Sequence, residues 1–177
     1  MFIPKKTNTT MRLLSAAAFL VASASASAYD WTEGFDLSVK QGDTMNLVVS
    51  PYTMHYTDDP KHKYVWALGI ERERASSQLS GAAFFSNSFG QPCVYLFPFG
   101  EIYRDLLGNQ GMYAKWTGGL LYGYTGQYEN KVPFNYNGFS PAIVPSLGWE
   151  FDGGKQVQVN LLGAAAIQLQ ASIPFKW

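Results

Sequence analysis

The 177-residue sequence has little cysteine, no excess charge of either sign, and no long hydrophobic run beyond its first residues. A single cysteine, Cys93, excludes a disulfide within the chain. The 13 Lys and Arg residues balance the 13 Asp and Glu residues, so nothing suggests the basic face that a nucleic-acid partner needs. No apolar run after residue 28 approaches the ~20 residues of a membrane-spanning helix. A disulfide scaffold, a nucleic-acid-binding protein and a helical membrane protein are therefore disfavoured.

The first 28 residues have the pattern of a secretory signal peptide. Three basic residues come first, an apolar stretch follows at 13–21, and Ala26-Ser27-Ala28 then gives a small-x-small cleavage site. A membrane anchor is the alternative, but this apolar stretch is shorter than the ~20 residues needed to cross a bilayer. We expect cleavage after Ala28, and Met11 is a second candidate for the start.

The sequence is instead rich in two-residue alternation and in aromatic residues, which make up 16% of it. Apolar side chains recur at every second position in several segments, and this is the pattern of strands with one apolar face. Turn-forming residues separate these segments and divide them into about eight strands. The expected strands are 46–57, 63–74, 78–86, 93–104, 112–125, 137–151, 155–163 and 165–177.

Two all-β architectures compete for this pattern, a soluble sandwich and a membrane barrel. The apolar faces are heavy in Tyr and Trp, which prefer bilayer interfaces, and the opposite faces hold Gly, Ala, Thr, Gln and Asn. Lys115 and Lys176 fall on the polar parity, so no mid-strand cation would face lipid, where it would cost ~2–4 kcal/mol. We therefore predict an eight-stranded antiparallel transmembrane β-barrel at 46–177, preceded by a short N-terminal periplasmic segment at 29–45.

The last strand, residues 167–177, shows the alternation most clearly. It predicts three aromatic or aliphatic side chains facing lipid and three polar side chains facing the interior. The outward set is Ile173, Phe175 and Trp177, and the inward set is Gln168, Gln170 and Ser172. A terminal aromatic residue on the lipid parity resembles the signal read by the outer-membrane insertion machinery. We therefore expect that machinery as a partner and the Gram-negative outer membrane as the location.

Chain polarity places a small group of polar residues at the outward rim of such a barrel. Both termini lie in the periplasm in this class, so the outward connections follow the first, third, fifth and seventh strands. His55 then lies at the outer end of the first strand, and Asn87 and Ser88 lie in the next outward connection. Eight strands leave room only for side chains or one slender ligand, which argues against a general solute pore.

Three short motifs carry a resemblance to a known family. They are Tyr52-Thr53-Met54-His55-Tyr56, Phe84-Phe85-Ser86-Asn87-Ser88-Phe89, and Pro141-Ala142-Ile143-Val144-Pro145 followed by Leu147-Gly148-Trp149. From about Pro51 onward the chain resembles the lipid A palmitoyltransferases (PagP-like proteins) of Gram-negative outer membranes. The resemblance implies an eight-stranded barrel that moves an acyl chain from phospholipid to lipid A, with these two lipids as partners.

The resemblance also implies roles for the rim residues. The family needs a His in the first outward loop and an Asp-Ser pair in the second. His55 and Ser88 occupy the matching positions, whereas Asn87 stands in place of the Asp. His55 would be the general base, and Ser88 a hydrogen-bond donor, nucleophile or proton relay. A neutral Asn87 can orient an imidazole but cannot stabilise imidazolium as a carboxylate does.

Other readings of the same residues stay open. Ser86-Asn87-Ser88 is also an ordinary turn sequence, and a rim histidine such as His55 is often only hydrogen-bonded filler. Lys61 and Lys63 on either side of His62 could touch lipopolysaccharide phosphates. No metal-ligand spacing, phosphate-binding loop or Gly-x-Ser-x-Gly elbow is present, so we expect no cofactor.

Two prolines in one expected strand, Pro141 and Pro145, point to a local gap in the wall. Proline cannot donate to a strand ladder, so the pair marks either an unpaired wall or a simple bulge. In the resembling family such prolines border gaps through which lipid enters sideways. The functional alternatives to an acyltransferase are a non-catalytic barrel that binds a lipid or amphiphile and a small-solute transporter barrel, which the narrow interior disfavours.

Overall fold

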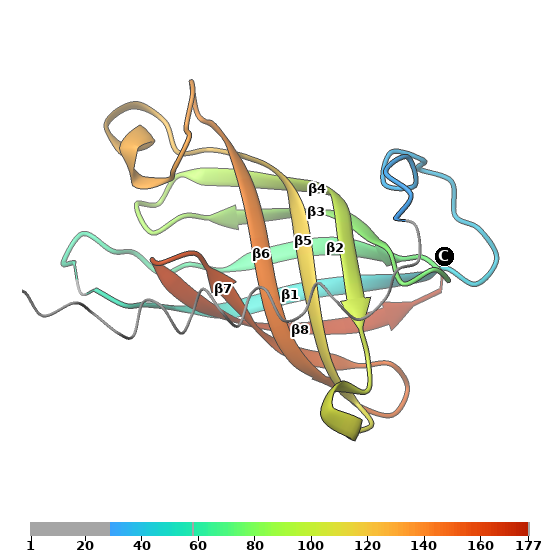
Figure 1. The fold of residues 1–177 in the computed structure, drawn as a ribbon. Coiled ribbons are helices and arrows are strands. Elements are labelled where there is room, and N and C mark those ends of the chain that lie inside the picture. The colour runs from blue at the N-terminus through green and yellow to red at the C-terminus, as the bar shows by residue number, and fades with distance from the viewer. Residues whose placement is uncertain (1–28, 58, 177) are drawn as a thin grey trace, which may run out of the picture. The chain divides into compact units, whose positions relative to one another are not determined.

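The structure is a computed structural model that describes residues 29–57 and 59–176. The expected signal peptide and Trp177 therefore lie outside the described residues. Eight antiparallel strands form one closed barrel, each strand pairing with its neighbours in sequence and the first with the last (Figure 1). The strands are β1 Thr44–His55, β2 Ala67–Glu73, β3 Leu79–Ser86, β4 Pro92–Tyr103, β5 Met112–Tyr122, β6 Phe139–Glu150, β7 Gln156–Leu162 and β8 Ala166–Phe175. The prediction of an all-β, eight-stranded antiparallel barrel is confirmed.

The barrel has two chemically different ends. We call the end where β1 begins and β8 finishes the terminal end, and the opposite end the loop end. The loop end carries the connections 56–66, 87–91, 123–138 and 163–165, the third of which includes the short 3-10 helix η3, Gly126–Lys131. A second 3-10 helix, η2, Leu106–Gly108, lies at the terminal end. No helix among the described residues is both long and apolar enough to cross a membrane.

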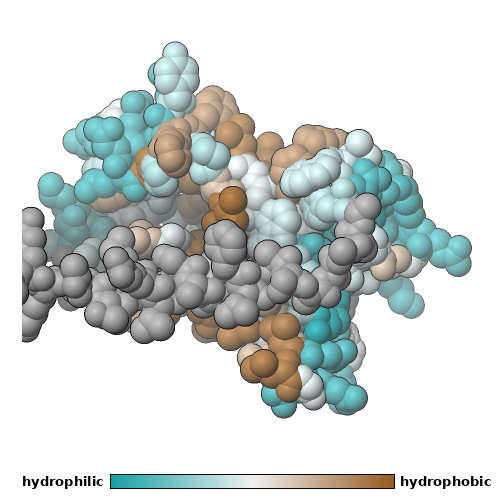
Figure 2. Space-filling model, in the orientation of Figure 1, coloured by the Kyte–Doolittle hydropathy of each residue, from teal (hydrophilic) through white to brown (hydrophobic). Residues whose placement is uncertain are grey.

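In β8 the alternation places apolar side chains outside and polar side chains inside. Ile173 is 50% exposed, whereas its neighbour Ser172 is 1% exposed. Gln168 and Gln170 are also buried, which confirms the predicted inward set of the last strand and the outward position of Ile173. Where the surface is visible in Figure 2, hydrophobic residues gather over the middle of the strands and hydrophilic ones toward the two ends.

The largest departure from the predicted strands is the start of β2. Strand pairing between β1 and β2 stops at Ser50↔Ala67, although the alternation continues back to Tyr64. The next residue of β1 is Pro51, which has no N–H to give to a ladder. The Tyr64 hydroxyl instead donates a hydrogen bond to the Pro51 carbonyl. This bond joins the two segments where the ladder has stopped.

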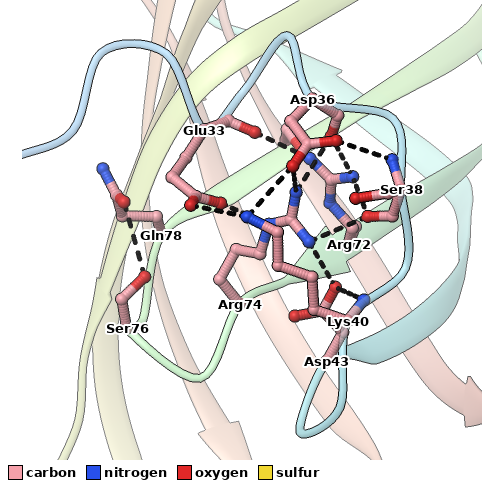
Figure 3. A network of polar contacts seen from close by, with 10 residues as sticks. Glu33, Asp36, Ser38, Lys40, Asp43, Arg72, Arg74, Ser76 and Gln78 are labelled. Atoms are coloured by element: carbon pink, nitrogen blue, oxygen red, sulfur yellow. Dashed lines mark hydrogen bonds and ion pairs between the residues drawn. The ribbon is translucent and has the colours of Figure 1, made fainter.

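The segment 31–43 lies against β2 at the terminal end and is held there by two arginines (Figure 3). Arg74 forms ion pairs with Asp43 at 2.6 Å, Glu33 at 2.7 Å and Asp36 at 3.4 Å. Arg72 donates to the backbone carbonyls of Glu33, Asp36 and Ser38. Both arginines face outward from the barrel, yet they are only 6% and 5% exposed because this segment covers them.

The same segment carries its own acid–base contacts and an aromatic contact with β4. Lys40 pairs with Glu33 at 2.9 Å and with Asp36 at 3.0 Å. Hydrogen bonds from Ser38 and Lys40 hold the pKa of the Asp36 carboxyl well below its usual value. The Trp31 and Phe35 rings both meet Phe99 edge to face, at 5.4 and 5.5 Å between centroids.

Arg104 forms ion pairs that cross the terminal end of the barrel. Arg104, just after β4, pairs with Glu73 of β2 at 2.6 Å and with Glu150 of β6 at 3.0 Å. Burial opposes the charge, but the hydrogen bonds and charges of the two carboxylates raise the pKa of Arg104 above its usual value. These ion pairs connect β4 with β2 and with β6, which are not its neighbours in the barrel, and so they span this end.

Candidate functional site: the interior cavity and its mouth

A cavity of about 490 Å³ runs from the loop end into the barrel. Its size is within the ~300–1,000 Å³ range typical of small-molecule sites. The mouth is lined by residues from the end of β1 and from all four loop-end connections. These residues include His55, Asp59, His62, Asn87, Ser88, Phe89, Lys131, Gly163 and Ala165. All three site residues predicted from the sequence, His55, Asn87 and Ser88, therefore lie at one mouth.

The walls of the cavity are largely apolar, whereas its deep end is polar. Apolar and aromatic side chains from all of the strands line the walls, among them Ala67, Phe85, Tyr95, Phe97, Leu121 and Val144. The deep end is lined by an ion pair and by several amides, namely Glu71, Lys115, Gln158, Asn160, Gln168 and Gln170. The cavity is thus amphipathic along its length.

A chain of ring contacts joins the loops above the mouth. The His55 and His62 rings lie 4.3 Å apart between centroids, and His62 meets the edge of Phe89 at 5.8 Å. Phe89 stacks on Tyr128 of η3 at 4.3 Å, and Lys131 lies 5.4 Å from the Phe89 ring centroid. A ligand at the mouth therefore meets imidazoles, an aromatic stack and an ammonium group.

One carboxylate, Asp59, lies beside these groups. Its Oδ1 accepts a hydrogen bond from the backbone N–H of Lys61 at 2.9 Å. This bond, together with the nearby positive charges of His62, Lys61 and Lys131, lowers the pKa of Asp59. The mouth thus holds an ionised carboxylate among several cationic or titratable groups.

Asn87 is used to shape its own loop. Its Oδ1 accepts hydrogen bonds from the backbone N–H groups of Phe89 at 2.9 Å and Gln91 at 3.0 Å. Its Nδ2 donates to the Gln91 side-chain oxygen at 3.2 Å, and the residue is 1% exposed. These contacts are those of a side chain that closes a turn, as the alternative reading of this sequence anticipated.

Ser88 lies at the mouth without a bond to the histidine. It is 6% exposed, and its carbonyl accepts a hydrogen bond from the backbone N–H of Lys63 at 2.8 Å. Among the hydrogen bonds joining described residues, none links His55 to Asn87 or Ser88. The structure brings the three residues to one opening but does not connect them as a hydrogen-bonded triad.

The deep end of the cavity contains an ion pair that was not singled out from the sequence. Lys115 Nζ of β5 donates to Glu71 Oε1 at 2.7 Å and to Oε2 at 2.8 Å, across the lumen from β2. The two side chains are 1% and 4% exposed. The alternation along β2 and β5 places both residues on inward positions, and this was the signal in the sequence that could have pointed to the pair. A buried pair is costly to desolvate, and removing one partner alone is costlier still.

A network of amides centred on Asn160 completes this end. Asn160 Nδ2 donates to Gln170 at 2.8 Å and to Gln168 at 3.0 Å. Its Oδ1 accepts from Ser146 at 2.7 Å and from the Gln158 amide. The Asn160 amide therefore uses both of its donors and both of its acceptor positions. Its side chain is fixed, and it fixes the neighbouring glutamines.

The barrel wall has a gap between β6 and β7 toward the loop end. The two strands pair only from Ser146↔Asn160 to Glu150↔Gln156, although β6 extends back to Phe139 and pairs with β5 throughout. Pro141 and Pro145 lie in the part of β6 that has no ladder to β7. Of the two alternatives left open for these prolines, an unpaired wall or a simple bulge, the structure shows the unpaired wall.

Among the described residues, no group of three or more His, Cys, Asp or Glu side chains is placed to hold a metal ion. No model of a known protein family matches the chain. No curated protein matches it either.

Proposed function

We propose that this chain is a barrel of the Gram-negative outer membrane that binds one lipid or other amphiphile with its apolar chain inside the barrel. The observation that carries this proposal is the amphipathic cavity, with apolar walls and a mouth set at the loop end. Each methylene moved from water into such walls contributes ~0.8 kcal/mol. A slender chain is the ligand that fits an eight-stranded lumen.

The outer surface of the barrel supports membrane placement. The outward positions of the strands expose large apolar side chains around the wall, among them Leu47, Leu68, Ile70, Leu96, Leu120, Ile143, Leu147, Leu169 and Ile173. A soluble protein rarely exposes so much contiguous apolar surface, whereas lipid is a suitable solvent for it. Phospholipid and lipid A are then the neighbouring lipids, and the insertion machinery is the proposed partner for β8.

Two openings support access for a lipid. The mouth lies at the loop end, which faces outward in the orientation typical of this class. The unpaired stretch of β6 beside β7 offers a sideways route at the same level. At the mouth, the polar head of the ligand would meet Lys131, His55 and His62, while its chain would run along the walls toward Lys115.

A second candidate function is acyl transfer of the lipid A palmitoyltransferase type. It is favoured by the position of His55 and Ser88 at the mouth of a chain-shaped cavity. The His55 imidazole would take the proton from an attacking lipid A hydroxyl as that oxygen bonds to the ester carbonyl of a phospholipid. The ester bond would then break, and the imidazolium would return the proton to the leaving lysophospholipid oxygen. Ser88 would donate a hydrogen bond to the developing oxyanion.

The binding proposal can be tested by filling the cavity. Leu121 lines it, whereas the adjacent Leu120 faces outward and is 46% exposed. Leu121→Trp should weaken binding of a fluorescent fatty acid by about tenfold or more, while Leu120→Trp should leave the affinity unchanged. Equal affinities in the two folded variants would contradict the proposed site. Heat-modifiable migration after folding in detergent tests the membrane barrel itself, and a protein soluble without detergent would contradict it.

Acyl transfer needs a separate measurement. Mass spectrometry of lipid A, after expression in a strain that lacks such an enzyme, should show an added acyl chain that is lost in His55→Ala. An unchanged acyl count from folded protein would rule out the second candidate and leave the binding proposal standing.

A further inference from the structure

The deep end of the cavity offers hydrogen-bond donors that have no partner among the described residues. Lys115 Nζ carries three N–H groups, of which two are used by Glu71. Gln170 uses its Oε1 to accept from Asn160 at 2.8 Å, but its Nε2 makes none of the hydrogen bonds that join described residues. Both residues line the cavity, and both are at most 9% exposed.

The acceptor oxygens at this end each accept at least one hydrogen bond from a described residue. Both carboxylate oxygens of Glu71 accept from Lys115, and Asn160 Oδ1 accepts twice. Gln158 Oε1 accepts from the Tyr113 hydroxyl at 3.0 Å, and Gln168 Oε1 accepts from Asn160. Each of these oxygens thus has a donor already, whereas Gln170 Nε2 and the third Lys115 N–H have no acceptor among the described residues. A ligand that satisfies these N–H groups has to bring an acceptor such as an oxygen.

A plain hydrocarbon chain does not fit this chemistry well. Its methyl end would cover the Lys115 and Gln170 donors without giving them an acceptor, and a buried donor without a partner is costly. A second carboxylate fits no better, because Glu71 already neutralises Lys115 and an additional buried anion would be uncompensated. A neutral oxygen, such as that of a hydroxyl group, satisfies the donors without adding charge.

We infer that the cavity is selective for acyl chains that carry a hydroxyl group at or beside their far end. This inference rests on the binding function proposed above and deepens it by naming the ligand class. The hydroxyl oxygen accepts from Lys115 Nζ or Gln170 Nε2 at the deep end. The anionic head of the same molecule lies at the mouth, near the Lys131 ammonium group and the two histidines.

The test compares plain fatty acids with their terminally hydroxylated derivatives, from decanoic to hexadecanoic acid, by competition against a fluorescent fatty acid. The protein is held in lipid nanodiscs, and the blocked Leu121→Trp variant supplies the background from partition into lipid. At the chain length that reaches the deep end, the hydroxylated acid should bind about tenfold more tightly than the plain acid of equal length. Equal or weaker binding of every hydroxylated acid would overturn the inference while leaving the proposed function intact.

A matched pair of variants assigns the preference to the deep end of the cavity. Gln170→Met removes one free donor and should reduce the preference severalfold, while binding of the plain acid is kept or improved. Gln156→Met is the control, since Gln156 is a buried inward glutamine of β7 that donates to Glu150 and does not line the cavity. A preference unchanged in Gln170→Met would overturn the assignment. If neither acid binds above the blocked variant, the proposed binding function itself is wrong.

Discussion

Removal of the Lys115 ammonium group should destabilise the barrel severely, because it leaves Glu71 charged and unpaired in the interior. The change is Lys115→Met, which keeps an unbranched apolar stem of similar length. In the structure both Glu71 oxygens depend on this one ammonium group, at 2.7 and 2.8 Å, and the carboxylate is 4% exposed. Breaking a buried pair in this way costs ~3–5 kcal/mol. That loss corresponds to roughly 2–4 orders of magnitude in the unfolding equilibrium constant.

A double variant, Lys115→Met combined with Glu71→Gln, should recover most of the free energy of unfolding that the single variant loses. Replacing both charges by neutral groups removes the desolvation cost along with the attraction. The free energy of unfolding is measured by urea titration of protein folded in detergent, followed by tryptophan fluorescence. With a urea dependence of ~1–3 kcal/mol per molar, the single variant should lower the midpoint by about 1–5 M.

The control is Lys155→Met, which changes an exposed lysine in the turn after β6. Its free energy of unfolding should stay within about 0.5 kcal/mol of that of the unchanged protein, as expected for surface substitutions. The reasoning would be refuted if Lys115→Met were as mild as this control. It would also be refuted if the double variant were as unstable as the single one, since the cost would then come from something other than the stranded carboxylate.

Three further predictions follow from the segment 31–43, from the rim and from the outer wall. Arg74→Met removes the ion pairs to Glu33, Asp36 and Asp43 and should speed tryptic cleavage at Lys40 several-fold. The control Lys155→Met should not change the rate of that cleavage. Equal rates of cleavage at Lys40 in the two variants would contradict the role given to Arg74. Asn87→Ala should lower the free energy of unfolding by ~1–3 kcal/mol, because two backbone N–H groups lose a buried acceptor. Asn87→Asp keeps that acceptor and should lower the free energy of unfolding by less. Equal losses of the two variants in a urea titration would be inconsistent with this account. Leu169→Lys, on the outward face of β8, should cost ~2–4 kcal/mol when unfolding is measured from liposomes, and a cost near zero would argue against a lipid-facing wall.

The strands were predictable because their alternation is local and is dictated by the environment on each side of the wall. The ends of β6, β7 and β8 lie within a few residues of their predicted positions. β2 starts later than predicted because its pairing depends on β1. Tyr64 and Trp66 continue the alternation, but the ladder from β1 stops beside Pro51. The alternation along β2 does not show that Pro51, on the neighbouring strand β1, has no N–H for the ladder.

The location of the candidate site residues could be predicted from the sequence, but their contacts could not. Chain polarity was enough to bring His55, Asn87 and Ser88 to one rim. The orientation of the Asn87 amide depends on the turn that it closes with Gln91, and only the folded loop shows it. The Glu71–Lys115 pair depends on how far the strands are staggered around the barrel, because stagger decides which inward positions of β2 and β5 meet across the lumen. Alternation fixes the facing of each residue but leaves that stagger open.

The seam between β1 and β8 has consequences for how the barrel assembles. Its pairs run from Met45↔Phe175 to His55↔Ala166, so every one of them joins residues separated by most of the barrel sequence. The other neighbouring strands are joined by comparatively short connections and can zip as hairpins. The seam therefore carries the largest chain-closure entropy and is the slowest contact to form. Until it forms, the sheet has two open edges, β1 and β8, whose unsatisfied backbone groups invite pairing with other chains.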